Sequence, residues 1–588
     1  MKVHWEWEFD VARERLWPWL ADTDWINANA GLPAISTRNE PLTNGGTRKL
    51  AWFYAGPVRV EWEERPTQWR VPEFYAVERL YASGPLKRFA NRTALEPVGA
   101  DRTRVIVDIE LEPRNAFAAP LMPLVAAQGK WGADRAFARA AARAASSQGP
   151  PEMGSGAFSR LLADGVDRGA LAALEQLFAV SDDRDLASLR PYEIADRYGI
   201  SRREMLRACL AATRAGLFNL RWEVICPGCR GTPNSFDTLS DLRPDLHCPS
   251  CNVPYGPQFD RSVEVRFSPR PMGRGSDVPL YCIASPQASA HVLAQTAVAP
   301  GARATLELSL DGGAYDINAV GVGIAPFVAS EEAVPSRIEG HVAPGHVSFP
   351  GEVWAGPAPL TIENRLERET VVRVEQGRWP DTIATAAQVT ALQEFRDLFS
   401  SEVLAPGLEL GIESIAVLFT DLVGSTAMYS RAGDAPAFRI VTDHFARIRA
   451  VFDRYGGAIV KTIGDAVMGV FYDPAACLQA ALELDGCVRD LKHEGEPLRL
   501  RVGFHYGPCI AMRANERLDY FGTTVNLAAR LEAQAGAGDV VLAAAVAARS
   551  DVAGVISGAL RKSHAELVAV KGFSRAVEVV RILEAQPN

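Results

Sequence analysis

The chain has 588 residues, of which 48% are hydrophobic and 23% are charged, and its formal net charge is −9. A chain of this length is too long for one hydrophobic core, so we expect about three to five domains. The acidic balance argues against a broad nucleic-acid-binding surface, and the sequence has no run of about eighteen apolar residues that would predict a membrane span.

The N-terminal segment and the cysteines bear on the compartment in which the protein works. The segment MKVHWEWEFD lacks the basic and then apolar pattern of a secretory signal, so we expect a cytoplasmic protein. In that compartment the nine cysteines are expected to be thiols or metal ligands rather than disulfides. Taken in order, the segments of the chain predict a multidomain α+β protein.

Residues 1–148 are predicted to form an α+β domain. Val3–Phe9 alternates apolar and polar residues, as a half-buried strand does, and an Ala/Arg-rich helix over about 121–145 closes the unit. This order of a strand, short helices, an antiparallel sheet and a long final helix resembles the helix-grip fold of START-like and polyketide-cyclase-like domains. The resemblance implies an apolar small ligand between sheet and helix. Nine of the twelve tryptophans lie here, and they either line such a pocket or pack the core.

Residues 155–222 have a helical pattern that is winged-helix-like. Ala195 and Gly199 lie four residues apart, which allows two helices to meet at a tight turn. Arg202, Arg203 and Arg207 follow that turn and can face DNA phosphates. Several acidic neighbours favour a structural module instead, so a nucleic-acid partner is not expected.

Residues 223–258 are predicted to be a zinc ribbon. Cys226 and Cys229 form one CxxC pair, and Cys248 and Cys251 form a second pair eighteen residues further on. Four thiolates at this separation can surround one Zn²⁺ tetrahedrally. Because four cysteines leave no open coordination position, the site would be structural.

Two further segments precede the C-terminal domain. Residues 259–380 have short alternating stretches, among them Val263–Phe267, and evenly spaced turn residues, which predict a β-sandwich-like region. Residues 381–410 are expected to be a helical linker, with one helix from Thr385 to Val403. That helix either pairs across a dimer or packs on its neighbours.

Residues 411–588 contain the residues with recognisable chemistry. The apolar run Ile415–Thr420 predicts a buried strand that ends on Asp421. A turn with Gly424 then leads into a helix from about Ser425, a geometry that suits phosphate. Further on, Gly464 and Asp465 occupy the turn of a predicted hairpin.

A third segment places an amide and a guanidinium together. Asn526 and Arg530 are four residues apart on a predicted helix, so they share one face. The three segments FTDLVGST, KTIGD and DYFGTTVNLAAR occur in this order. In these segments, the stretch from about Glu413 to Leu583 resembles the catalytic domain of the class III adenylate/guanylate cyclases.

The resemblance implies a fold, a reaction and a site. The fold would be ferredoxin-like, and the chain would be an adenylate cyclase that closes ATP to cyclic AMP and pyrophosphate. Asp421, Asp465 and the Leu422 carbonyl would hold two Mg²⁺ or Mn²⁺ ions per site. Asn526 would orient the ribose and Arg530 would stabilise the transition-state phosphate.

The substrate contacts follow the same resemblance. Lys461 donates and Asp519 accepts hydrogen bonds, a pair that fits the edge of adenine rather than guanine. Gly424, Ser425 and Thr426 would contact the phosphates. Lys571, with Arg575 as the alternative, would reach the triphosphate.

The family builds each site from two chains, which implies a homodimer regulated by its N-terminal domains. Three other functions remain open from the sequence. The chain can be a guanylate cyclase, a catalytically silent nucleotide-binding regulatory module, or a DNA-binding regulator. Intact site residues disfavour the silent module, and overall acidity disfavours the DNA-binding regulator.

Overall fold

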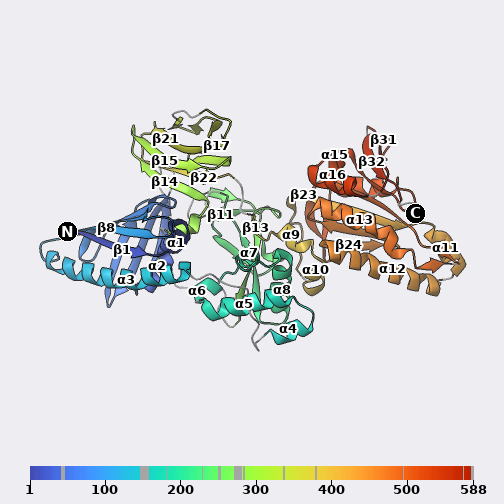
Figure 1. Cartoon of the computed structure of the whole chain (residues 1–588), viewed down its shortest axis with the longest axis horizontal. Coiled ribbons are helices and arrows are strands. Elements are labelled where there is room, and N and C mark those ends of the chain that lie inside the picture. The colour runs from blue at the N-terminus through green and yellow to red at the C-terminus, as the bar shows by residue number, and fades with distance from the viewer. Residues whose placement is uncertain are drawn as a thin grey trace.

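The computed structural model describes residues 1–41, 47–145, 158–181, 183–227, 230–248, 253–270, 281–282, 285–334, 338–377, 381–400, 402–432, 434–493, 495–559, 561–573 and 575–584. The N-terminal body and the C-terminal body lie at opposite ends of the molecule, with a helical region between them (Figure 1). No helix among these residues has the length and hydropathy needed to cross a bilayer.

The N-terminal body is an antiparallel sheet packed against one long helix. Its strands are β1 (Lys2–Phe9), β2 (Ser36–Pro41), β3 (Thr47–Ala55), β4 (Val58–Glu64), β5 (Gln68–Arg70), β6 (Phe74–Tyr81), β7 (Leu86–Pro97) and β8 (Thr103–Pro113). Its helices are α1 (Arg13–Leu20), α2 (Thr23–Asn29) and α3 (Met122–Ala145). Trp17, Trp25 and Trp69 are buried in a core with Phe137 of α3, whereas Trp131 is 59% exposed. These three tryptophans pack the core, and the apolar ligand and the helix-grip relationship stay predictions.

Two sheets after the N-terminal body enclose a core of their own. The strands are β14 (Val292–Val298), β15 (Arg303–Leu310), β16 (Gly313–Ala319), β17 (Gly323–Ser330), β18 (Ile338–Ala343), β19 (His346–Ser348), β20 (Glu352–Trp354), β21 (Gly356–Asn364) and β22 (Thr370–Gln376). One sheet has the order β14-β22-β16-β17-β20 and the other β15-β21-β18-β19. Strand β14 also pairs with β5, so the first sheet continues into the N-terminal body.

The middle region combines helices with a small sheet. The helices are α4 (Ser159–Ala163), α5 (Arg168–Val180), α6 (Asp183–Leu186), α7 (Pro191–Tyr198) and α8 (Arg202–Arg214). The strands are β9 (Phe218–Val224), β10 (Asn234–Phe236), β11 (Leu246–Cys248), β12 (Val253–Tyr255) and β13 (Val263–Pro269). Helices α7 and α8 meet at Gly199, whose φ of +66° favours glycine. Strand β13 pairs with β9, so Val263–Phe267 lies in this sheet and not in the sandwich where the sequence placed it.

The expected single helix over 385–403 is two short helices. They are α9 (Ala386–Thr390) and α10 (Gln393–Leu398), and they are separated by Leu392 in an extended conformation with ψ of 133°. Thr385 caps α9 in a capping box with Gln388. Helix α9 packs on β13, while α10 packs on α8 and β24. The prediction of one helix was wrong because two different packing surfaces override a continuous helical pattern.

The C-terminal body is a sheet covered by helices. Its strands are β23 (Leu410–Leu422), β24 (Gly457–Ile463), β25 (Ala466–Phe471), β28 (Leu500–Ala514), β29 (Arg517–Phe521), β30 (Val540–Ala543), β31 (Ser563–Val568) and β32 (Val577–Ile582). Its main helices are α11 (Ser425–Ala432), α12 (Asp434–Tyr455), α13 (Pro474–Val488), α14 (Thr523–Glu532) and α16 (Ser550–Gly558). The path β23-α12-β24-β25-α13-β28, with the sheet order β24-β25-β23-β28, is the predicted ferredoxin-like arrangement.

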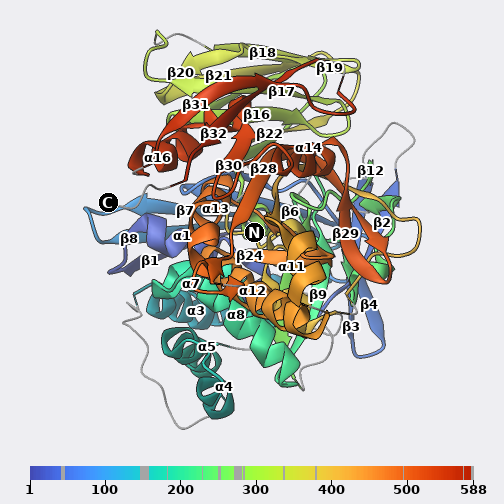
Figure 2. The ribbon, with the colours of Figure 1, turned by 90° about the vertical axis from the view of Figure 1, so that its right-hand side faces the viewer.

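Strand β23 is buried on both faces, which explains its continuous apolar run. Ala416 and Leu418 face the domain's own helical core. Val417 and Phe419 alternate with them and belong to a second core that also contains Trp222 of the middle region and Phe395 of α10. The middle region, the linker and the C-terminal sheet therefore share one hydrophobic core. Figure 2 shows the chain with the C-terminal body toward the viewer.

Candidate active site

The first carboxylate of the site, Asp421, lies at the end of β23. It is opposite Arg501 in the register of β23 and β28, and the two side chains form an ion pair. Arg501 also contacts Glu532 of α14, with 2.5 Å between Nε and Oε1. Neither Arg501 nor Glu532 is among the site residues predicted from the sequence. The signal that could have found Arg501 is a charged residue inside the otherwise apolar segment Leu500–Phe504.

The Glu532 carboxyl has a raised pKa. Burial raises the pKa of Glu532 to about 7, with Arg501 opposing this shift and Asp421 and Asp465 adding to it. The three acids therefore share one electrostatic neighbourhood. The Glu532 carboxyl changes charge near neutral pH beside the residues expected to hold metal.

The second carboxylate, Asp465, lies on the turn between β24 and β25. Gly464 precedes it with φ of +64°, a left-handed conformation that the tight turn requires. One oxygen of Asp465, Oδ2, is buried and has no hydrogen-bond partner among the described residues. An unpartnered buried carboxylate oxygen is costly, and a cation would satisfy it.

These two carboxylates fit a divalent cation. Mg²⁺ is commonly held by one or two carboxylates together with substrate phosphates and waters. The described residues contain no cluster of three or more His, Cys, Asp or Glu side chains that could hold a metal by themselves. Asp421 and Asp465 would thus supply the side-chain ligands, with Leu422, the last residue of β23, beside them.

The structure brings the predicted base-reading pair together. Lys461 lies on β24 and Asp519 on β29, and 2.5 Å separate Nζ from Oδ2. The other oxygen of Asp519 accepts a hydrogen bond from the Tyr520 amide at 2.8 Å. Residues that are 58 positions apart in the sequence therefore form one donor–acceptor unit.

Asn526 and Arg530 lie on one face of α14, which begins after Gly522. Both side chains are exposed. Neither side chain makes a hydrogen bond or an ion pair with another residue in the described part of the chain. The predicted ribose and phosphate residues thus point to solvent within a single chain.

The structure describes most, but not all, of the residues that are predicted to contact phosphate. Gly424 has φ of +76° and α11 begins directly after it, at Ser425. The side chain of Thr426 lies outside the described residues. Lys571 and Arg575 are both exposed between β31 and β32. Contacts of these residues with a triphosphate stay predictions.

The predicted zinc site falls partly outside the described residues. Cys226 and Cys248 are fully buried, Cys248 at the end of β11. Cys229 and Cys251 are not among the described residues, so the four-cysteine site stays a prediction.

The three arginines after Gly199 contact other parts of the chain. Arg202 pairs with Asp196 at 2.7 Å. Arg203 donates to the backbone carbonyls of Asp453 and Arg454 at the end of α12, and Arg207 pairs with Glu394 of α10 at 2.8 Å. All three guanidinium groups thus have partners within the chain.

Comparison with known proteins places the C-terminal body in a class. Residues 410–581 match the family described as adenylate and guanylate cyclase catalytic domain, and residues 155–275 match a family of unknown function (DUF5939). An uncharacterized protein of Mycobacterium bovis is 37% identical over 129 residues, which are 21% of this chain and 32% of that protein. Adenylate cyclase 2 of Rhizobium meliloti is 33% identical over 150 residues, which are 23% of this chain and 41% of that protein. The matches thus span less than half of either relative.

Among solved structures, the catalytic core of a rhodopsin-guanylyl cyclase with converted specificity, in complex with ATPαS, is 25% identical. The match covers 30% of this chain and 99% of the chain in that structure, and its TM-score is 0.27. Residues 410–581 are a class III adenylate/guanylate cyclase catalytic domain, as the motifs predicted. Class III cyclases generally use Mg²⁺ or Mn²⁺.

Proposed function

We propose that the protein converts ATP to 3′,5′-cyclic AMP and pyrophosphate. The observation that carries the choice of ATP is the contact between Lys461 and Asp519. Adenine presents an amino donor and a ring acceptor on its Watson–Crick edge, which an acid and an amine can read together. Guanine presents its donor and acceptor in the reverse order on that edge, so neither Lys461 nor Asp519 would face a complementary group.

The residues expected around the phosphates have different roles in the reaction. The ribose 3′ oxygen attacks the α-phosphorus in line, and the bond to the pyrophosphate oxygen breaks. A divalent ion held by Asp421 and Asp465 would neutralise phosphate charge and lower the pKa of the attacking hydroxyl. Arg501 adds a fixed positive charge beside Asp421, and Arg530 stabilises charge on the transferring phosphorus. Asn526 orients the ribose.

We infer that each site is completed by a second copy of the chain. The exposed face of α14 with Asn526 and Arg530, whose side chains have no partner among the described residues, supports this arrangement, because groups that act on phosphate need a ligand or a second chain opposite them. In a two-fold symmetric dimer the carboxylates of one chain would meet this face of the other chain, which gives two equivalent sites. The upstream regions would then influence activity through the angle between the two catalytic domains.

The test is nucleotide selectivity. Full-length protein with Mg²⁺ or Mn²⁺ is expected to form cyclic AMP from ATP and little cyclic GMP from GTP. The double variant K461E/D519C should shift the ratio of the two products toward cyclic GMP by at least tenfold, since hydrogen-bond readout of a base is strongly discriminating. K562E, which repeats the Lys-to-Glu change of the first substitution at an exposed position of the same domain, is the control. Unchanged selectivity in the double variant would refute the base-reading roles.

A further inference from the structure

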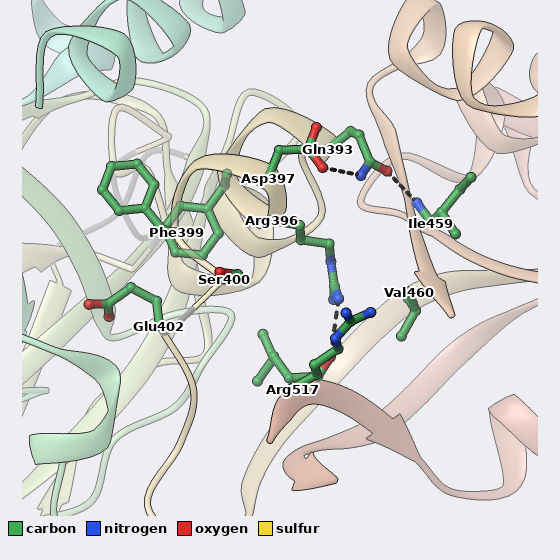
Figure 3. A pocket seen from close by; sticks show the side chains of 11 residues that line it. Gln393, Arg396, Asp397, Phe399, Ser400, Glu402, Ile459, Val460 and Arg517 are labelled. Carbon is green, nitrogen blue, oxygen red and sulfur yellow. Dashed lines mark hydrogen bonds between the residues drawn. The ribbon is translucent and has the colours of Figure 1, made fainter. Parts of the chain in front are cut away.

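A cavity of about 290 Å³ lies between the linker and the catalytic sheet (Figure 3). Its walls come from α10 and the segment after it on one side, and from β24 and β29 on the other. This volume is near the lower end of the range of small-molecule pockets, about 300–1,000 Å³. The cavity is separate from the carboxylates and from the open face of α14, and none of its lining residues belongs to the predicted active site.

The acids that line the cavity are already paired. Asp397 accepts from Gln393 Nε2 at 2.9 Å and forms an ion pair with Arg449. Glu402 accepts from the Leu239 amide at 2.9 Å and from Trp222 Nε1 at 3.1 Å, and burial raises its pKa. Neither carboxyl is directed at a cation of the cavity.

The two guanidinium groups that line the cavity have no acidic partner among the described residues. The side chain of Arg517 makes no ion pair or hydrogen bond with another described residue, and its backbone pairs with Ala514 in the β28–β29 hairpin. Arg396 donates to two backbone carbonyls, those of Thr390 and Leu518, at 2.8 and 3.1 Å, and its Nη2 is buried without a partner in the described chain. The two guanidinium groups point toward one another (Figure 3). Two uncompensated guanidinium groups facing each other are the arrangement that an anion stabilises.

The remaining wall is aromatic. Phe395 and Phe399 stack, with 5.3 Å between ring centroids and 22° between their planes, and both line the cavity. Flat aromatic faces favour contact with a planar or apolar body. The cavity thus combines an anion-binding end with an apolar surface.

The cavity is connected to the base-reading pair through the backbone. Gln393 Oε1 accepts from the Ile459 amide of β24 at 2.7 Å, and Ile459 lies two residues before Lys461. The Arg396 guanidinium donates a hydrogen bond to the backbone carbonyl of Leu518, the residue before Asp519. A ligand that moves Arg396 therefore acts on the strands that carry both base-reading residues.

We propose that this cavity binds a small organic anion, a carboxylate or a phosphate monoester with a flat apolar body, between Arg396 and Arg517. Occupancy changes nucleotide turnover by shifting β24 against β29, and this second part rests on the proposed cyclase function. The anion replaces the missing counter-charge, and its body lies on Phe395 and Phe399.

The test uses full-length protein and four probes. Benzoate and phenyl phosphate represent the two anion sources, and benzamide and benzyl alcohol are their neutral counterparts. Calorimetric titration is expected to detect at least one anion and neither neutral probe. R517Q should weaken that binding at least tenfold, the loss expected for one charge-assisted pair. R513Q is the matched control, because Arg513 lies on the same hairpin and pairs with Glu516 outside the cavity.

The outcomes separate the two parts of the proposal. Absence of anion binding, or equal loss in R517Q and R513Q, would overturn the binding site. Binding that leaves ATP turnover and the ratio of cyclic AMP to cyclic GMP unchanged at saturation would overturn the coupling to the base-reading pair. Absence of any cyclic nucleotide product would contradict the proposed function itself, and the titration would still decide the binding site.

Discussion

The two halves of the active site differ in how their charges are held within one chain. Asp421 is paired with Arg501, which also contacts Glu532, whereas one oxygen of Asp465 has no hydrogen-bond partner among the described residues. Asn526 and Arg530 are exposed and have no partner in the described chain. One half is thus held in place by contacts within the fold, and the proposed dimer would supply the partner of the other half.

Removing Asp465 is expected to have the largest effect. D465N should lower turnover at least a thousandfold, about 4 kcal/mol of transition-state stabilisation, because a metal ligand is lost. The same variant should not lower thermal stability, since the removed charge is partly buried and one of its oxygens has no partner. D443N, an exposed acid on α12, is the control for both measurements. A destabilised D465N protein with normal turnover would contradict the assignment.

A mixing experiment tests whether the two halves of a site come from different chains. D421A and R530A are each expected to be nearly inactive, with R530A reduced roughly 10³-fold or more as for other arginines in phosphoryl transfer. Mixed together, they should recover roughly a quarter of wild-type activity, because random exchange in a two-fold dimer restores one intact site in half of the dimers. No recovery after demonstrated subunit exchange would mean that both halves of a site come from one chain.

The titration of Glu532 predicts a smaller, pH-dependent effect. Its pKa is raised from 4.5 to about 7, so the folded domain holds this proton where the unfolded chain releases it. The stability contributed by the group is complete below about pH 4.5 and is lost as the pH rises through about 7. Without metal, wild-type protein should therefore lose more stability than E532Q between pH 5 and 8. Thermal unfolding of both proteins across that range tests it, and parallel curves would contradict the shift.

The smallest effect is expected at the contact between the middle region and the catalytic domain. Arg203 donates to two carbonyls at the C-terminal end of α12, where a cation is favourable. R203A should lower the free energy of unfolding by about 1 kcal/mol. R214A, at the exposed end of α8, should change it little. Equal effects in denaturant titrations would show that the contact does not couple the regions.

Much of the catalytic domain could be predicted because its signals are local. The strand that carries Asp421 near its end, the hairpin turn at Gly464 and the helix with Asn526 and Arg530 each follow from short periodic patterns and turn residues. Arg501 and Glu532 could not be found this way. Their roles depend on a register between strands 80 positions apart, and on the burial of a charged residue in a helix.

The linker, in contrast, was predicted wrongly from its sequence. Its apolar spacing predicts one helix, but the chain turns at Leu392 so that α9 and α10 pack on different surfaces. Local propensity is a weak determinant where two cores compete for the same segment. The three arginines after Gly199 are similar, since their charge suggested an outward surface while the fold directs Arg203 and Arg207 to α12 and α10.

The class of the catalytic domain, and the side chains that could hold metal or read a base, follow from residue types at fixed spacing in the sequence. Which charged groups contact one another, and which stay exposed, depends on the fold in three dimensions. The fold places Lys461 beside Asp519, leaves Arg530 exposed, and forms a cavity in which Arg396 and Arg517 have no acidic partner among the described residues. Such pairings are set by strand register and by packing between distant segments, which a local pattern does not specify.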